Sequence, residues 1–314
     1  MTDKTIKYLG IDISKKWIDV CYGDKGKVKR IAMKKSSINS FIKKHFEENE
    51  AVLAVLESTG GYEVLPAKCL ESFGIKVHIA HPNKVVSFAK AMGCLAKTDA
   101  IDAKVLKAYG AFIKDDDIRG LPSDQDLELN ALSSRLGQLK ETHHQEACRL
   151  GLVKDKILKS SSERMLKYLK KEIEKIEQHM MAIINEDKVL ANKFDILTSM
   201  PGIGANTACC IVCDLPEIGR INNKEIAALV GVAPITNQSG MKSGYSAIKY
   251  GRSKVRKTLY MAALVATRFN SRMKDFYNRL LENGKIKKVA IVAVMRKMLV
   301  TLNAMVKQNM QFSA

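Results

Sequence analysis

The sequence is short of acidic residues and of long hydrophobic runs. Asp and Glu total 33 against 52 Lys and Arg, which gives a formal charge of +19. An excess of this size favours a polyanionic partner, because cations that bind phosphates release counterions. No run of 18 apolar residues occurs, so no membrane span is expected. The polar start from Met1 to Lys7 is followed by no apolar segment, so no signal peptide is expected and a cytoplasmic location is predicted.

Cysteine is also scarce. The seven cysteines are odd in number and scattered, which argues against a disulfide framework in a chain of 314 residues. Cys210 and Cys213 form a C-x-x-C pair, but no second Cys or His pair follows at the spacing of a zinc site. They lie in the apolar run ACCIVC, where a free cysteine behaves as a small buried hydrophobe.

The first 120 residues read as a mixed α/β domain. Three strand-like segments with short polar turns form a meander, and they are followed by alternating helical and strand-like segments. The continuous apolar run at 51–56 is typical of a buried central strand. Strands are predicted at 5–11, 17–23, 27–33, 51–56 and 75–79, and helices at 37–48, about 62–73, from 82, and 99–113.

The rest of the chain reads as helical. Residues 123–192 contain no proline, and their apolar residues recur at helical spacing, which predicts two long helices that form a hairpin or a dimer arm. A third region begins near 195 and is mainly α, with helices predicted at about 252–270 and 285–308. The predicted domains are 1–120, a helical hairpin or coiled-coil linker at 121–194, and 195–314.

Four carboxylates are informative as a set, and the position of Glu57 is the hardest of them to explain by structure alone. Asp12 is predicted to end the first strand and Glu57 to follow the central strand, while Asp99 and Asp102 share one face of a helix at i,i+3. Asp12 as a turn residue and Asp99 as a helix N-cap remain alternatives. Like charges placed together need a cation, and hard oxygen ligands suit Mg²⁺ or Mn²⁺.

Two C-terminal motifs suit contact with phosphates. PGIGANTA at 201–208 reads as a helix-hairpin-helix-like turn, in which a helix N-terminus offers free N–H groups; a tight helix connection without a ligand is the alternative. The segment from Gly231 to Arg256 combines glycines, serines and cations. The cations predicted to contact nucleic acid are Lys242, Lys249, Arg252, Lys254, Arg256 and Lys257.

The motifs GIDIS, LESTGGY and KTDAIDA, in this order, resemble those of the DEDD transposases of insertion-sequence family 110, which include the Piv/MooV-type recombinases. The resemblance extends to GVAPITNQSG and YGRSKVRKTLYMAA in the C-terminal region. It implies a ribonuclease-H-like (RuvC-like) N-terminal domain, in which the DEDD set is Asp12, Glu57, Asp99 and Asp102. It also implies that Ser239 is the recombinase nucleophile; Ser243, Ser246 and Tyr245 are its nearby competitors.

The expected function is therefore a transposase or site-specific DNA recombinase. It would cleave and rejoin DNA with a metal-dependent phosphoserine intermediate, at element ends and target, and would be nucleoid-associated. The resemblance implies a structured noncoding guide RNA, and the four breaks of strand exchange imply a homodimer or tetramer. A RuvC-like hydrolytic nuclease, with water as the nucleophile, is the main alternative. An architectural DNA-binding protein is a third, but it leaves the four acids unexplained.

Overall fold

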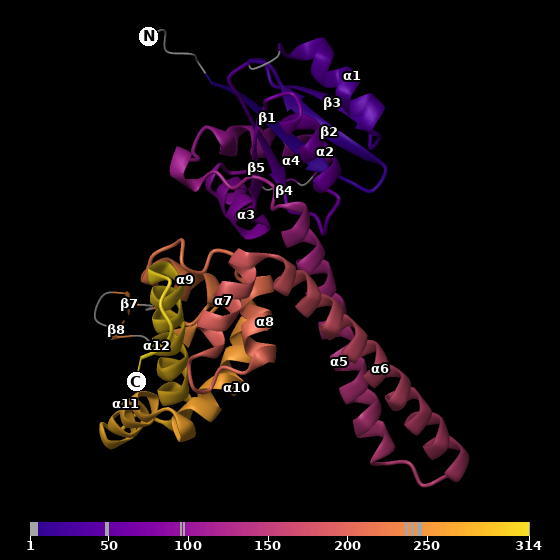
Figure 1. Ribbon diagram of the computed structural model, residues 1–314. Helices are drawn as coiled ribbons and strands as arrows, with labels where there is room; N and C mark the ends of the chain where they lie inside the picture. The colour runs from indigo at the N-terminus through magenta and orange to yellow at the C-terminus, as the bar shows by residue number, and fades with distance from the viewer. Residues whose placement is uncertain are drawn as a thin grey trace. The chain divides into compact units, whose positions relative to one another are not determined.

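The computed structural model divides into two compact units, residues 1–123 and 124–314, which are described here one at a time (Figure 1). The structure describes residues 6–47, 50–94, 96, 98–235, 238–239, 242–243 and 247–313, and at 238–239 and 242–243 it describes the backbone alone. Three domains were predicted. The two long helices belong to the same compact unit as the C-terminal helices, and the boundaries 1–120, 121–194 and 195–314 stay a prediction.

The N-terminal unit is a five-stranded mixed sheet in the order β3-β2-β1-β4-β5. β1 to β3 are antiparallel neighbours, whereas β4 runs parallel to both β1 and β5. Its strands are β1 (Lys7–Ile13), β2 (Trp17–Tyr22), β3 (Lys27–Ala32), β4 (Val52–Glu57) and β5 (Lys76–Ala80). Its helices are α1 (Lys35–His45), α2 (Val64–Glu71), α3 (Pro82–Ala91), α4 (Asp99–Gly110) and the short η1 (Asp115–Asp117). The predicted mixed α/β class is confirmed.

Helices cover both faces of this sheet, because its central strands are apolar on both sides. Leu9, Ile11 and Ile13 of β1 share a core with α1 and α2. Tyr8 of β1 contributes to a second core with Leu53, together with residues of α3 and α4. Since side chains alternate between the faces of a strand, the even-numbered residues of β1 lie on the α4 face.

The C-terminal unit is built almost wholly from helices. α5 (Asp124–Leu150) and α6 (Lys156–Glu186) pack along each other, as the helical spacing predicted. The remaining helices share one large core. They are α7 (Lys188–Thr198), α8 (Ala205–Asp214), α9 (Asn223–Val230), α10 (Ser253–Phe269), α11 (Ser271–Glu282) and α12 (Lys287–Gln308).

α12 is the one described helix that is long and apolar enough to cross a membrane, with a mean hydropathy of 1.8 over an 18-residue window. Half of that window is buried inside the unit. α12 packs against α7, α9, α10 and α11, and its side chains include Leu299 and Leu302, which are fully buried. Its apolar composition is therefore explained by its place in a helical core.

The PGIGANTA motif forms the connection between α7 and α8. Gly202 has φ +103°, and an added Cβ there would lie 2.8 Å from the Cβ of Ala266 in α10. Gly202 is thus required for close packing of this turn against α10. This agrees with a tight connection between two helices, which was one of the two interpretations of the motif. Gly204 is the N-cap of α8, and no side chain of the described residues accepts a hydrogen bond from the first N–H groups of this helix. Binding of a phosphate at this helix N-terminus stays a prediction.

Candidate functional site

The predicted carboxylates come together on the α4 face of the sheet. Asp12 lies inside β1 rather than at its end, because the strand continues to Ile13; this corrects the prediction that the strand ends at Asp12. Glu57 is the last residue of β4, one position beyond Leu56, the partner of Ile11 in β1. Asp12, the last but one residue of β1, and Glu57, the last residue of β4, therefore lie near the same end of neighbouring parallel strands and on the same face.

α4 brings the other two acids, and it lies unusually close to β1. A Cβ on Gly10 would overlap the backbone carbonyl oxygen of Ala103 and the backbone nitrogen of Lys107 in α4. The helix starts with Thr98 as its N-cap, whose Oγ1 accepts a hydrogen bond from the Ile101 N–H at 3.3 Å. Asp99 is therefore not the N-cap, as one alternative proposed, and its carboxylate is available for the site.

Asp12 shows the electrostatic consequence of this arrangement. Burial raises the pKa of Asp12 to about 6, and the negative charges of Asp102, Asp99 and Glu57 add to the increase. All three other predicted acids are thus near enough to act on Asp12, and the oxygen atoms of Asp12 and Asp99 also lie within 4.8 Å of each other. A carboxylate that is hard to ionise among like charges is expected where a cation is meant to bind.

Asp19 of β2 is a fifth carboxylate in this site, and sequence reasoning missed it. One carboxylate oxygen each from Asp12, Asp19 and Asp99 lies within 4.8 Å of the others, so one cation can contact all three residues. Asp19 stands directly opposite Asp12 in the pairing of β1 with β2 and is only 5% exposed. The signal was present in the sequence, since Asp19 is a charge between the apolar Ile18 and Val20 of a predicted strand.

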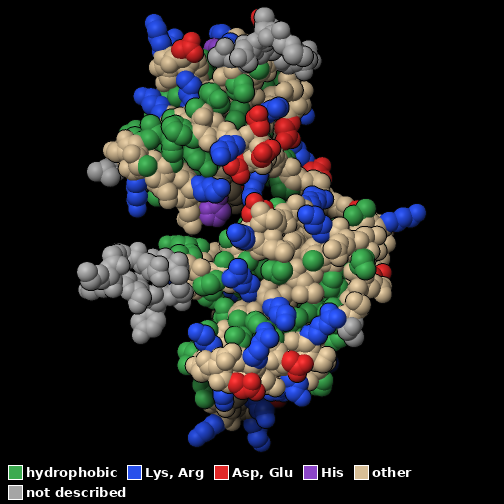
Figure 2. Space-filling model, turned by 90° about the vertical axis from the view of Figure 1, so that its left-hand side faces the viewer, with side chains coloured by type: hydrophobic (Ala, Val, Ile, Leu, Met, Phe, Trp, Pro, Cys, Tyr) green, Lys and Arg blue, Asp and Glu red, His purple; other side chains and the backbone are tan. Residues whose placement is uncertain are grey.

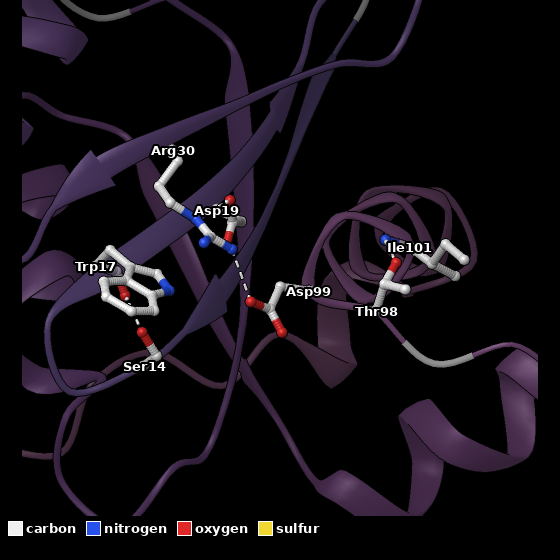
Figure 3. A network of polar contacts seen from close by, with 7 residues as sticks. All are labelled: Ser14, Trp17, Asp19, Arg30, Thr98, Asp99 and Ile101. Atoms are coloured by element: carbon white, nitrogen blue, oxygen red, sulfur yellow. Dashed lines mark hydrogen bonds and ion pairs between the residues drawn. The ribbon is translucent and has the colours of Figure 1, made fainter.

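Arg30 of β3 lies between Asp19 and Asp99 (Figure 3). Its Nε donates to both oxygens of Asp19 at 3.0 and 3.2 Å, and one terminal nitrogen donates to Asp19 and to Asp99, each at 2.7 Å. The guanidinium also lies over the ring of Trp17, 4.9 Å from its centroid. A cation of the chain itself therefore touches the carboxylate cluster.

Three cations predicted to contact nucleic acid have partners inside the C-terminal unit. Arg252 binds the Glu217 carboxylate with two hydrogen bonds of 2.5 and 2.6 Å, and also the Asp214 carbonyl. Lys254 pairs with the Asp214 carboxylate at 2.9 Å. Arg256 donates to the carbonyl oxygens of Val230 and Tyr250.

Lys249 and Lys257 are exposed and suit contact with phosphates better than these three. Lys and Arg side chains are widely distributed over the face of the molecule in Figure 2, in keeping with the formal charge of +19. Contact with a long polyanion therefore need not rest on the segment from Gly231 to Arg256 alone.

The segment that carries Ser239 starts and ends at a closely packed stem. Gly231 and Gly251 both have φ +77°, and an added Cβ on either would overlap the backbone of the other strand of the stem. β6 (Pro234–Ile235) pairs with β9 (Ala247–Ile248), and the Arg252 N–H donates to the Leu229 carbonyl at 3.0 Å. The two ends of the segment are therefore held side by side.

Inside the segment, Ser239 belongs to β7 (Gln238–Ser239), which pairs with β8 (Lys242–Ser243) so that Ser239 stands opposite Lys242. The side chains of Ser239, Lys242 and Ser243 are not described, and Tyr245 and Ser246 lie outside the described residues. The structure therefore does not choose between Ser239 and its competitors.

Comparisons with known proteins identify the family. The profile of the transposase IS116/IS110/IS902 family matches residues 194–278, and a transposase profile of the IS110 DEDD type matches residues 9–155. The chain belongs to the IS110 family of transposases. It is a DNA transposase or recombinase.

Curated relatives support the same family. The chain is 28% identical to the pilin gene-inverting proteins of Moraxella bovis and Moraxella lacunata, over 97% of both chains in each case. It is 25% identical to the 43.6 kDa protein of insertion element IS110 from Streptomyces coelicolor, over 36% of this chain and 29% of that protein. The DEDD profile covers the whole carboxylate site described above, which is consistent with dependence on a divalent metal.

The pKa of Asp12 predicts how metal binding depends on pH. Asp12 must lose its proton to bind a cation, so the affinity for Mn²⁺ should be constant above about pH 6. It should fall about tenfold per pH unit below that value. Calorimetric titration with Mn²⁺ between pH 5 and pH 8 measures this, and affinity that does not change over that range would contradict it.

The same shift has a stability consequence in chelator. The native pKa is raised above the ordinary 3.8, so the native state holds the Asp12 proton more tightly than the unfolded state does. The free energy of unfolding should therefore decrease as pH rises from about 4 to about 6. Asp12→Asn should remove this part of the pH dependence, which denaturant unfolding at several pH values measures.

Proposed function

We propose that the N-terminal unit is a ribonuclease-H-like (RuvC-like) catalytic domain that binds Mg²⁺ or Mn²⁺ through Asp12, Glu57, Asp99 and Asp102. The observation that carries this proposal is the close approach of the Asp12 and Asp99 carboxylates, whose oxygens lie within 4.8 Å of each other, and the charges of Asp102 and Glu57 act on the same Asp12. The sheet order, with three antiparallel strands followed by two parallel ones, supports the fold assignment. When bound, the metal ions would polarise the scissile phosphate and lower the pKa of the attacking hydroxyl.

The nucleophile in this proposal is the hydroxyl of Ser239. Its oxygen attacks phosphorus and forms a phosphoserine ester, while the bond to a deoxyribose oxygen breaks and that oxygen leaves as a hydroxyl. Another DNA strand's hydroxyl then attacks the phosphoserine, rejoins DNA and restores the serine. Because one ester replaces another, strands are rejoined without an external energy source. Hydrolysis by water would end the reaction at cleavage.

The proposal has three further parts. Exchange of two duplexes needs four strand breaks, which favours a homodimer or tetramer. A structured noncoding RNA that guides the choice of element ends and target is supported only by the family and by the formal charge of +19. A cytoplasmic, nucleoid-associated location remains a prediction of the same kind.

Trapping on a nicked suicide substrate tests the nucleophile. Ser239→Ala should yield no covalent protein–DNA adduct, whereas Ser243→Ala and Tyr245→Phe should still form one. Mass spectrometry of the attached peptide identifies the residue. An adduct on Tyr245, or recombination by Ser239→Ala, would make the serine assignment wrong. Cleavage without any adduct would support the second candidate function, that of a hydrolytic nuclease. Metal ions at the carboxylate site would be enough for this reaction, with water as the nucleophile.

The internal partners of Arg252 predict a difference between two cations of the same segment. Lys257→Gln should weaken DNA binding and reduce the slope of log affinity against log salt by about one, because one phosphate contact is lost. Arg252→Gln should instead lower the melting temperature, since it leaves Glu217 without its bidentate partner. Fluorescence anisotropy at several salt concentrations and thermal unfolding measure the two effects. Equal salt slopes for Lys257→Gln and wild type would count against a phosphate contact there.

A further inference from the structure

The carboxylate site contains a row of charged side chains that crosses three strands. In the register of the sheet, Asp12 of β1 stands opposite Asp19 of β2, and Asp19 stands opposite Arg30 of β3. All three lie on the α4 face, where Asp99 completes the group. The family motifs account for Asp12 and Asp99 but assign nothing to Asp19 or Arg30.

Two carboxylates hold the Arg30 guanidinium, and their side chains differ in exposure to solvent. The side chain of Asp19 is 7% exposed and accepts three of the four hydrogen bonds that Arg30 donates to this pair of carboxylates, so Asp19 anchors Arg30. The fourth goes to Asp99, whose side chain is 52% exposed. A buried carboxylate needs its partner, whereas an exposed ion pair contributes little and is easily broken.

We propose that Arg30 is an internal cation that occupies the place of a divalent metal ion at Asp99, and that it releases Asp99 when metal binds. The Asp99 carboxylate that accepts from Arg30 also belongs to the group of carboxylates that can hold a metal ion, and two cations on one carboxylate repel each other. Arg30 remains bound to Asp19 after its release. Its freed N–H groups then bind a phosphate of the DNA held at the metal site, since a guanidinium matches phosphate oxygens.

This inference rests on the proposed function, and it explains two features of the site. The cluster of acids is stable without metal because Arg30 neutralises part of its charge. The position of Asp19 between Asp12 and Arg30 is explained as well, because a buried carboxylate at that place fixes the guanidinium beside Asp99 without needing to bind metal itself. Trp17, over which the guanidinium lies, limits its movement to one side.

Titration of the full-length protein with Mn²⁺, followed by the electron paramagnetic resonance signal of free Mn²⁺, tests the competition. Arg30→Lys keeps the charge but loses the planar fork that bridges two carboxylates, so Mn²⁺ should bind at least about threefold more tightly than to wild type. The double variant Asp19→Asn with Arg30→Gln also keeps the net charge of the site, and the same result is expected. Thermal unfolding verifies that each variant is folded. Unchanged or weaker Mn²⁺ binding in the folded variants would overturn the proposal.

Asp102→Asn separates this inference from the proposed function. If Asp102→Asn loses Mn²⁺ affinity while Arg30→Lys does not change it, only the role of Arg30 is wrong. If Asp102→Asn binds Mn²⁺ like wild type, the metal site of the proposed function is wrong as well.

DNA binding tests the released state. In chelator, wild type and Arg30→Gln should show the same salt slope, because Arg30 is held by Asp99. Ca²⁺ allows binding without turnover. In Ca²⁺, the slope of log affinity against log salt should be steeper by about one for wild type than for Arg30→Gln, because wild type makes one more phosphate contact. Equal slopes for the two proteins in Ca²⁺ would overturn the phosphate contact.

Discussion

Asp102→Asn should abolish metal-dependent DNA cleavage and leave the fold intact. Asp102 faces the site from the first turn of α4, and after burial its charge is the largest cause of the raised pKa of Asp12. Asparagine has the same shape but no negative charge, so the metal site loses affinity while the packing of α4 is kept. We expect a loss of about a thousandfold in cleavage rate, at the upper end of the effects seen when a group that stabilises transition-state charge is removed.

The matched control is Asp116→Asn, which changes the same side chain at an exposed position of η1 in the same unit. It should cleave like wild type. Cleavage of a labelled element-end substrate in Mg²⁺, together with circular dichroism of both variants, measures the effect. Full activity of Asp102→Asn, or of wild type in chelator, would show that the carboxylates are not the metal site.

Gly10→Ala should disrupt the site without changing any charged residue. The added Cβ would overlap backbone atoms of Ala103 and Lys107, which cannot rotate away as a flexible side chain can. α4 must therefore move away from β1, and it carries Asp99 and Asp102 with it. Overpacking of this kind costs about 1–3 kcal/mol or more in the free energy of unfolding. Affinity for Mn²⁺ should fall more than about tenfold, because a metal site tolerates little displacement of its ligands.

Gly137→Ala is the matched control, because it makes the same change where there is space. Gly137 lies inside α5, and its added Cβ would meet only the end of the Lys254 side chain at 3.9 Å. Alanine should stabilise this helix by up to about 1 kcal/mol. Denaturant unfolding and Mn²⁺ titration of both variants measure the contrast. Wild-type stability and metal affinity in Gly10→Ala would mean that the contact between α4 and β1 does not position the acids.

The sequence by itself determined the mixed α/β class, most helices and strands, and the three acids whose charges act on Asp12, which are Glu57, Asp99 and Asp102. These features are set by local patterns. The alternation of a strand and the spacing of a helix are read from neighbouring residues. Asp99 and Asp102 share one side of α4 because they are three positions apart. The motifs around Asp12 and Glu57 are equally local.

Only the tertiary structure decided what each charged side chain contacts. Arg30 meets Asp99, which is 69 positions away, and Arg252 meets Glu217, which is 35 positions away. A charge in the sequence shows that a partner is needed but not which one. Asp19 therefore remained unnoticed inside an apolar strand, and the bidentate pairing of Arg252 with Glu217 was not foreseen. Strand register fixed the neighbours of Asp19, and helix packing fixed those of Arg252.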